Sequence, residues 1–200
     1  MVRAGSERAL ALALLVVASP LLVAIATVVR SQLGSPVLFH QVRIGKDEVP
    51  FTMWKFRTMT DARDPSTGEL LPDAERLGRF GRWLRATSLD ELPELWNVAR
   101  GDMHLVGPRP LPVHYLPRFL PSERARHRVR PGITGLAQVS GRNALGWDER
   151  LALDVWYVEH RSLRLDLSIA RRTVAAVVRR HGVSADDEAT MAELPTDRAR

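Results

Sequence analysis

Two adjacent carboxylates, Asp90 and Glu91, are the side chains in this sequence whose types and spacing best suit chemistry. They lie in segment 87–102, which continues through Pro93 to a run of apolar residues. Adjacent side chains on a helix point about 100° apart, so this pair cannot grip one atom from two sides as a glycosidase pair does. The pair suits two separate tasks, with one carboxylate attacking an electrophile and the other holding a divalent cation.

The same residues also fit a purely structural arrangement. Ser88 and Glu91 have the spacing of a capping box, with Ser88 as the N-cap and Glu91 three positions later. Pro93 argues against it, because proline prefers the first helical turn and would start the helix after the two carboxylates. Spacing alone leaves both interpretations open.

Arginines in turn-rich segments are the next candidates. Segment 103–110 predicts a short buried strand that delivers Arg109 into a loop braced by two prolines, which suits a phosphate or a structural salt bridge. Segments 128–135 and 138–142 combine glycines, arginines and Gln138, and such turns can cradle phosphates. The Gly-x4-Gly-Lys-Ser/Thr pattern of a P-loop is absent, as are zinc-ligand spacing among the six histidines and the Gly-x-Ser-x-Gly elbow of hydrolases.

Composition describes a folded chain with a basic surface. Of 200 residues, 45% are hydrophobic and 26% charged, and the net charge is +6. Only Lys46 and Lys55 are lysines, so arginine dominates the basic residues and anionic partners are plausible. The absence of cysteine excludes disulfides and thiolate chemistry.

An uncharged apolar run over residues 9–29 is long enough to cross a bilayer as a helix. Pro20 has no N–H to donate to the carbonyl of Val16, so we expect a kink or a break, and the Ser19 hydroxyl is near enough to bond that carbonyl. A break allows the chain to re-enter and leave on one side, and arginines on both flanks pull both ends toward the cytoplasm. A kinked single span is the alternative, and a cleaved signal peptide fits less well because the apolar run is too long.

The remaining pattern predicts an α+β fold. We expect a strand hairpin over 36–59, a mobile loop over 60–73, and helices near 75–85, 89–100, 113–126, 147–160 and 165–180. The last helix has apolar residues at Leu165, Ile169, Thr173 and Val177 beside arginines, which suits either a membrane surface or packing on the core. We expect residues beyond 182 to be frayed.

Several motifs, in order along the chain, resemble a known family. They are the Ser19-Pro20 helix, Trp54-Lys-Phe-Arg-Thr-Met59, Leu84-Arg-Ala-Thr-Ser-Leu-Asp-Glu-Leu-Pro93, Leu95-Trp-Asn-Val98, Gly101-Asp-Met103, Leu105-Val-Gly-Pro-Arg-Pro110, Arg130-Pro-Gly-Ile-Thr-Gly135, Gln138 and Leu153-Asp-Val-Trp-Tyr157. Over residues 9–180 the chain resembles bacterial sugar transferases of the monotopic polyprenyl-phosphate phosphoglycosyl transferase family. It departs from the family at His104, where serine is usual, and in the longer loop 60–73.

The resemblance implies transfer of a phospho-sugar from a UDP-sugar to polyprenol (undecaprenyl) phosphate, with release of UMP. It implies that Asp90 forms a covalent aspartyl phospho-sugar and that Glu91 helps to bind Mg²⁺. The candidates for substrate and phosphate binding are Lys55, Arg57, Arg85, Arg109 and Gln138.

The resemblance also implies three parts: a broken re-entrant membrane helix at 1–30 with its break at Ser19 and Pro20, a mostly helical cytoplasmic transferase domain at 31–182, and a flexible acidic tail at 183–200. Its amphipathic helices would lie on the cytoplasmic face of the bacterial cell membrane, at the first membrane step of surface glycoconjugate or exopolysaccharide synthesis. Its partners would be the two substrates, membrane lipid and later glycosyltransferases, but not nucleic acid. The rivals are a basic membrane module without chemistry and an aspartyl-type phosphatase.

Overall fold

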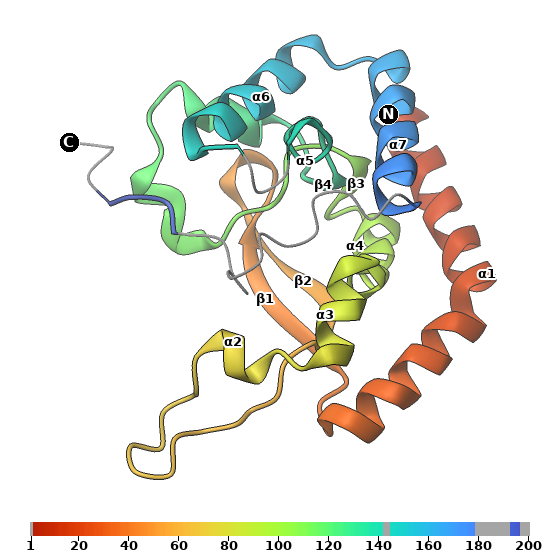
Figure 1. The fold of residues 1–200 in the computed structure, drawn as a ribbon. Helices are drawn as coiled ribbons and strands as arrows, with labels where there is room; N and C mark the ends of the chain where they lie inside the picture. Colours follow the sequence, from red (N-terminus) through yellow and green to blue (C-terminus); the bar gives the residue numbers. More distant parts are fainter. Residues whose placement is uncertain (1, 142–144, 179–192, 197–200) are drawn as a thin grey trace.

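A long apolar helix with a small mixed domain packed along it makes up the fold in the computed structural model, which describes residues 2–141, 145–178 and 193–196 (Figure 1). In chain order the elements are α1 Val2–Leu33, β1 Leu38–Ile44, η1 Lys46–Glu48, β2 Pro50–Phe56, α2 Asp73–Arg76, α3 Arg79–Ala86, η2 Leu89–Glu91, α4 Glu94–Arg100, β3 His104–Val106, η3 Val113–Arg118, η4 Glu123–Arg128, β4 Gly132–Thr134, α5 Leu136–Ser140, α6 Trp147–His160 and α7 Leu163–Val178. The predicted mixture of helix and strand is confirmed.

Helix α1 passes through Pro20 without interruption. The Ser19 hydroxyl donates to the carbonyl of Val16 over 2.7 Å, which satisfies the acceptor that Pro20 leaves without a backbone donor. The predicted use of Ser19 is therefore confirmed, but the predicted break is wrong. The helix stays continuous and bends along its length (Figure 1). Within the described residues it is the one helix that is long and apolar enough to cross a membrane, judged by length and composition.

Both halves of α1 pack on the domain. Ala11 is buried with residues of β2 and α4, and Ile25 and Val29 are buried with Phe56 and Leu84. Between its two ends the helix also carries exposed apolar residues, at Leu10, Leu12, Leu14, Val16, Val17, Leu21, Val23 and Val28. The domain thus covers one side of α1 and leaves a second apolar side uncovered.

The predicted hairpin is confirmed. Strands β1 and β2 pair antiparallel around η1, from Leu38 opposite Phe56 to Ile44 opposite Pro50. Arg43 lies opposite Phe51, and Phe39 lies opposite Lys55. Because strand side chains alternate between faces, this register places Arg43 and Lys55 on the same face of the hairpin.

Four of the five predicted helices have different boundaries or a different type. The segment expected to be helical at 89–100 forms the turn η2 and the shorter helix α4. The helix expected at 75–85 is two short helices, α2 and α3, because the chain is extended at Gly78 between them. The segment expected to be helical at 113–126 forms two 3-10 turns, η3 and η4, and Pro117 lies inside the first. Helix α6 has the predicted bounds, and α7 begins two residues earlier than predicted and is described to Val178.

A second, two-stranded parallel sheet pairs β3 with β4. The strand before Arg109 was expected, but its partner was not. An added Cβ at Gly132 would lie 2.1 Å from the Gly107 nitrogen, and one at Gly135 would lie 2.3 Å from the Gly107 oxygen. These glycines therefore allow two backbone segments to approach closely, which accounts for them without a phosphate cradle.

The apolar stripe predicted on α7 packs on the core. Ile169 is fully buried in a cluster with Val106 and Tyr157, and the Thr173 hydroxyl hydrogen-bonds that of Thr134 over 2.7 Å. The solvent side of α7 nevertheless carries further apolar residues, Leu163, Leu167, Val174 and Val178.

Asn97 joins α4 to the hairpin, and we expect its loss to destabilise the fold. Its side chain is fully buried, donates to the Thr52 carbonyl over 2.7 Å and accepts from the Trp54 N–H over 3.2 Å. Asn97→Ala leaves both backbone groups unpaired, so urea unfolding of the detergent-solubilised protein should show a loss of about 2–4 kcal/mol. The exposed Arg79→Ala should change the free energy of unfolding by less than about 0.5 kcal/mol. A similar small change for Asn97→Ala would contradict this account.

Candidate active site

The turn η2 presents the two adjacent carboxylates before α4 begins. Pro93 is the N-cap of α4, so Asp90 and Glu91 precede the helix as its position suggested. Ser88 has φ 56° and its side chain makes no capping hydrogen bond. The capping-box interpretation is therefore wrong, and the Glu91 side chain is directed elsewhere.

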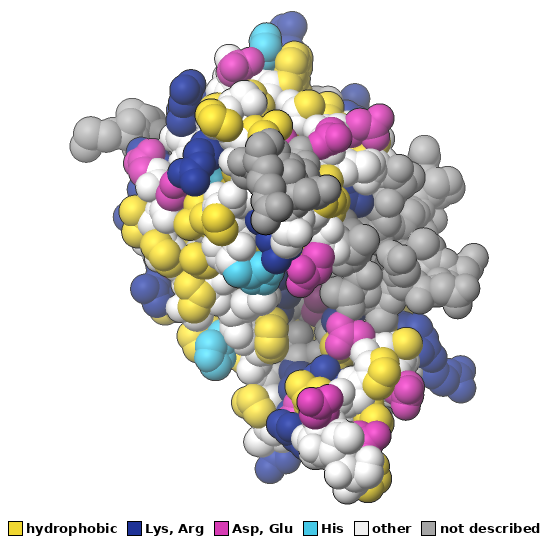
Figure 2. Space-filling view, turned by 90° about the vertical axis from the view of Figure 1, so that its left-hand side faces the viewer, with side chains coloured by type: hydrophobic (Ala, Val, Ile, Leu, Met, Phe, Trp, Pro, Cys, Tyr) yellow, Lys and Arg dark blue, Asp and Glu magenta, His cyan; other side chains and the backbone are white. Residues whose placement is uncertain are grey.

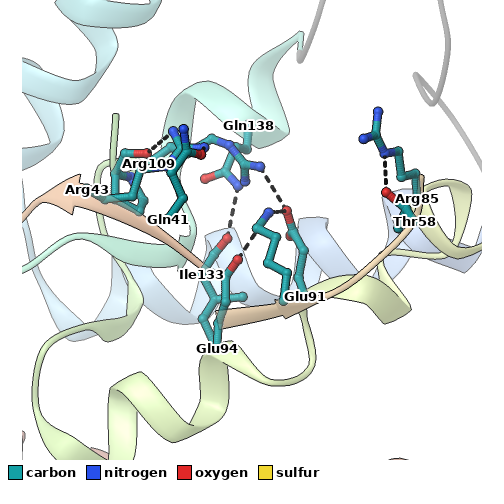
Figure 3. A network of polar contacts seen from close by, with 11 residues as sticks. Gln41, Arg43, Thr58, Arg85, Glu91, Glu94, Arg109, Ile133 and Gln138 are labelled. Atoms are coloured by element: carbon teal, nitrogen blue, oxygen red, sulfur yellow. Dashed lines mark hydrogen bonds and ion pairs between the residues drawn. The ribbon is translucent and has the colours of Figure 1, made fainter. Parts of the chain in front are cut away.

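One oxygen of Glu91 receives two cations. Glu91 Oε1 lies 2.6 Å from Lys55 Nζ on β2 and 2.8 Å from Arg109 Nη2, which follows β3 (Figure 3). Lys55 Nζ also lies 3.1 Å from Oε1 of Glu94 on α4. The cluster therefore joins the hairpin, η2, α4 and the loop after β3 at a single point.

Asp90 lies beside this cluster without a partner. It is 8% exposed and makes no hydrogen bond or ion pair with any residue that the structure describes. Burial and the adjacent Glu91 charge raise the pKa of Asp90 to about 6, and the charges of Lys55, Arg109 and Arg85 oppose the rise. Asp90 is thus a buried carboxylate whose oxygens have no bonding partner among the described residues.

The pKa values of the two neighbouring carboxylates, Glu91 and Glu94, shift in opposite directions. Burial opposes ionisation of Glu91, but Arg109 and Lys55 outweigh it and hold the pKa of Glu91 well below its usual value. Burial raises the pKa of Glu94, which Lys55 only partly offsets. In return, the charge of Glu91 raises the pKa of Arg109 and outweighs the opposing effect of partial desolvation. Groups whose surroundings push their pKa values apart are typical of sites that divide chemical tasks among similar residues.

Two further arginines hold the loop that carries Arg109. Arg126 Nη2 donates to the Arg109 carbonyl over 2.7 Å, and Arg43 Nη1 donates to the Pro110 carbonyl over 3.2 Å. Arg126 is itself fixed by two hydrogen bonds, of 2.7 and 3.1 Å, to Oδ2 of Asp154 on α6, and both side chains are buried. The position of the Arg109 side chain therefore depends on a buried ion pair.

The other predicted site residues differ in how they relate to this cluster. Arg85 Nε donates to the Thr58 hydroxyl over 3.1 Å, and its charge acts on Asp90. Gln138 lies beside Arg109 (Figure 3) and donates to the Ile133 carbonyl over 3.0 Å, and its buried Oε1 has no hydrogen-bond partner. Arg57 does not join the cluster. Its guanidinium bonds the carbonyls of Ser35 and Met59 and the Asp61 carboxylate.

An open cavity of about 1880 Å³ connects these groups. Its lining includes the cations Arg43, Lys55, Arg85, Arg109 and Arg150, the carboxylates Asp90 and Glu91, Gln138, and the α1 residues Leu14, Val17 and Ala18. A buried carboxylate with free oxygens among arginines can attack a phosphorus atom whose other oxygens the arginines bind. Ser19 and Pro20, also predicted as site residues, lie in α1 next to the cavity-lining Ala18.

The carboxylates suit Mg²⁺ only in part. No group of three or more His, Asp or Glu side chains able to hold a metal ion occurs among the described residues. Lys55 and Arg109 occupy Oε1 of Glu91, and Oε2 makes no contact of this kind with a described residue. Mg²⁺ commonly takes one or two carboxylates and completes its shell with phosphate oxygens and water. Glu91 Oε2 and the unpaired Asp90 fit that pattern.

Sequence reasoning missed Arg43 and Glu94 as members of the site. For Arg43, the signal was the strand alternation that puts it on the Lys55 face of the hairpin. Glu94 is the third acidic residue of the motif and is 1% exposed, but its burial follows from how α4 packs on β2 and cannot be derived from spacing.

Comparison with known proteins identifies what the chain resembles. A model of the family described as bacterial sugar transferase matches residues 1–180. The uncharacterized sugar transferase EpsL of Bacillus subtilis is 53% identical over 82% of this chain and 80% of its own length. The UDP-glucose:undecaprenyl-phosphate glucose-1-phosphate transferase of Klebsiella pneumoniae is 39% identical over 80% of this chain, and the undecaprenyl-phosphate galactose phosphotransferase of Salmonella typhimurium is 38% identical over 84%. The chain spans only 37% and 39% of those two proteins.

We expect the buried ion pair behind Arg109 to be strongly coupled. Arg126→Met leaves the Asp154 charge buried with its main partner removed, so the free energy of unfolding should fall by about 3–5 kcal/mol in urea titrations. The double variant Arg126→Met/Asp154→Leu removes both charges and should recover most of that loss. Arg128→Met, at an exposed position on the same turn, is the control and should have little effect. A double variant no more stable than Arg126→Met would contradict the coupling.

Proposed function

The chain belongs to the bacterial sugar transferase family, and we propose that it transfers a phospho-sugar from a UDP-sugar to polyprenol (undecaprenyl) phosphate. The observation that carries this proposal is the unpaired, buried Asp90 carboxylate beside the cations of the Glu91 cluster. The names of the Klebsiella and Salmonella relatives include glucose and galactose, so the proposal specifies a UDP-sugar and no particular hexose.

Asp90 is the proposed nucleophile because it alone among the three acids combines access with availability. One oxygen of Glu91 is bound by two cations, and Glu94 is almost fully buried against Lys55. Asp90 lines the cavity, has no bound partner, and its raised pKa makes its carboxylate more basic than an ordinary aspartate. A more basic oxygen is a better nucleophile, provided that it is deprotonated at the working pH.

The proposed reaction has two displacements at phosphorus. An oxygen of Asp90 bonds to the β-phosphorus of the UDP-sugar, and the bond between that phosphorus and the bridging oxygen breaks, so that UMP leaves with the electron pair. A phosphate oxygen of the polyprenol phosphate then attacks the same phosphorus. The aspartyl oxygen leaves as a carboxylate, and the product is polyprenyl diphosphate-sugar.

The cations have separate proposed tasks in these steps. Arg109 has donors beyond the one that reaches Glu91, and its backbone carbonyl is fixed by Arg126, so it is the best candidate to bind the diphosphate. The positive charges of Lys55 and Arg85 both act on Asp90. Gln138 Oε1, buried without a partner, is available to accept a substrate hydroxyl. Arg57 is fully engaged by three acceptors, and we assign it to the base of loop 60–73 instead of to phosphate.

Glu91 Oε2, with Asp90 nearby, is the proposed protein ligand for Mg²⁺, whose contribution would be to neutralise the charge of the diphosphate. The chain's own part is to keep Glu91 ionised, which Lys55 and Arg109 do by holding its pKa low.

We propose that α1 re-enters the membrane and leaves on the cytoplasmic face. Its support is that both ends of the helix contact one domain: Glu7 pairs with His104 on β3, and Val29 packs with Leu84 on α3. A spanning helix would carry one of these ends across the bilayer, away from the domain. The uncovered apolar side of α1 would then lie in lipid, and the exposed apolar residues of α7 would lie at the surface. The opposite side of the molecule mixes charged and apolar side chains (Figure 2), as expected of a water-facing surface.

Two other functions are distinguished by one assay. A basic membrane module would bind anionic lipid without turnover, and an aspartyl-type phosphatase would pass the phosphoryl group to water. In a screen of UDP-sugars, we expect UMP to be released over repeated turnovers only when undecaprenyl phosphate is present. Continued release without the lipid acceptor, beyond one UMP per protein, favours the phosphatase, and no release with any sugar favours the module. The product would be the first lipid-linked substrate for later glycosyltransferases of surface glycoconjugate or exopolysaccharide synthesis.

Asp90→Asn should abolish covalent labelling. Incubating the protein with its UDP-sugar and no lipid should add one phospho-sugar, measured by intact mass and mapped to Asp90 by peptide analysis. The acyl phosphate should be lost on addition of undecaprenyl phosphate. Glu91→Gln should reduce labelling by about 100-fold or more, in line with removal of an oriented charged group at a reacting site. Wild-type labelling or turnover in Asp90→Asn would remove Asp90 from the mechanism.

Cysteine labelling should place both ends of α1 on one side of the membrane. The chain has no cysteine, and Gly5 and Gln32 are exposed positions at the two ends of the helix. Gln32 is preferable to Gly34, whose φ of +79° would strain a side chain. In intact cells, Gly5→Cys and Gln32→Cys should both resist an impermeant maleimide and react after permeabilisation. Reaction of Gly5→Cys in intact cells would show that α1 spans the membrane.

A further inference from the structure

Residues 193–196 are seated on the domain, although the sequence suggested a flexible tail over 183–200. They lie on the other side of the molecule from the end of α7 (Figure 1). Leu194 is 0% exposed and completes a core cluster with Ile44 of β1, Leu111 and Tyr115, together with Phe119 and Leu151. The remaining residues of that tail lie outside the described part of the chain.

Polar contacts fix the same segment. Arg118, at the end of η3, donates from Nη1 to the Leu194 carbonyl over 2.6 Å and pairs with the Glu193 carboxylate over 3.1 Å. The Arg118 guanidinium lies over the Tyr115 ring, 5.1 Å from its centre. His114 Nε2 lies 4.0 Å from the other Glu193 oxygen. An apolar anchor with a bonded main-chain carbonyl is a specific seat, because both the leucine and the backbone must be placed correctly.

The seat belongs to the segment that carries Arg109. Leu111, one wall of the Leu194 socket, follows Arg109 closely, and its carbonyl accepts from the Ile44 N–H over 2.9 Å. Tyr115 and Arg118 lie on η3, which continues the same segment. Glu193 lines the cavity that also holds Asp90 and Arg109. Residues 193–196 lie beyond residues 1–180, which match the family model, so this support is an addition to the region that defines the family.

We propose that residues 193–196 form an intramolecular strap that positions the Arg109 segment for binding of the sugar nucleotide. Leu194 anchors the strap in the core, Arg118 holds it by donating to the Leu194 carbonyl, and Glu193 lines the adjacent edge of the cavity. The strap acts through Leu111 and η3 and makes no contact with the reacting atoms. Its effect should therefore fall on binding of the anionic substrate and not on the chemical step. The choice of ligand rests on the proposed function, but the seating of the strap does not.

The seating is tested without any assay of activity. In the cysteine-free full-length chain, Leu194→Cys and Thr196→Cys place one thiol each at a buried and an exposed position of the strap. We expect maleimide to label Cys at 194 at least about tenfold more slowly than Cys at 196, because reaction requires the strap to open. Adding Arg118→Met should bring the two rates together. Equal rates in the parent background would overturn the strap.

The positioning role is tested by separating KM from kcat. Leu194→Asp should raise KM for the UDP-sugar by about tenfold, leave KM for undecaprenyl phosphate unchanged and leave kcat within about twofold. The conservative Leu194→Met should keep the parent KM for the UDP-sugar. Thr196→Asp is the matched control for added charge. Arg118→Met is the second disruptive variant, for use if Leu194→Asp does not fold, and it should raise the same KM.

Unchanged KM in both disruptive variants, or a fall in kcat alone, would overturn the positioning role. Absence of turnover in the parent protein with every UDP-sugar would refute the proposed function and this role with it, whereas the labelling rates would still report the seating of the strap.

Discussion

A single carboxylate oxygen, Oε1 of Glu91, organises the site. It accepts Lys55 from the hairpin and Arg109 from the loop after β3, so three segments that are distant in sequence converge on one atom. Because this oxygen holds the two cations, the neighbouring Asp90 has no ion-pair partner among the described residues, and burial together with the Glu91 charge raises its pKa. The unpaired carboxylate and the anchored cations are therefore two results of one arrangement. Adjacent carboxylates achieve it because successive side chains in a turn point in different directions.

The same convergence ties the site to α1. The β2 strand that carries Lys55 also packs Met53 and Phe56 against the two halves of α1, and α4 packs against its first half. An apolar helix seated along the domain holds the cavity at a fixed distance from the surface that lipid would cover. The Ser19 hydroxyl helps α1 to stay continuous through Pro20, since it donates to the Val16 carbonyl that Pro20 leaves without a backbone donor.

Local sequence rules predicted the elements whose signals are local. The hairpin and α6 follow from strand alternation and helical periodicity, and Pro93 favoured the interpretation in which α4 starts after the two carboxylates. The pairing of β3 with β4, the burial of Glu94 and the pairing of Arg126 with Asp154 depend on contacts between distant segments, which no local pattern encodes. The motif around Asp90 and Glu91 holds adjacent residues that the structure also brings together with Lys55 and Arg109, whereas Arg57 bonds Asp61 and does not join that cluster. The seat of Leu194 had no sequence signal beyond one leucine in a polar stretch.

The account depends most directly on Asp90 being an unpaired carboxylate whose pKa is raised by burial and by the charge of Glu91. The decisive measurement is an NMR titration of the full-length protein in detergent with ¹³C-labelled aspartate carboxyls, with Asp90→Asn used to assign the signal. We predict a carboxyl with a pKa of about 6 that is absent in Asp90→Asn. In Glu91→Gln the same signal should titrate at lower pH, because the charge that raises the pKa is gone while Lys55 and Arg109 remain. An Asp90 signal that titrates at or below the usual aspartate pKa, or does not move in Glu91→Gln, would contradict the account.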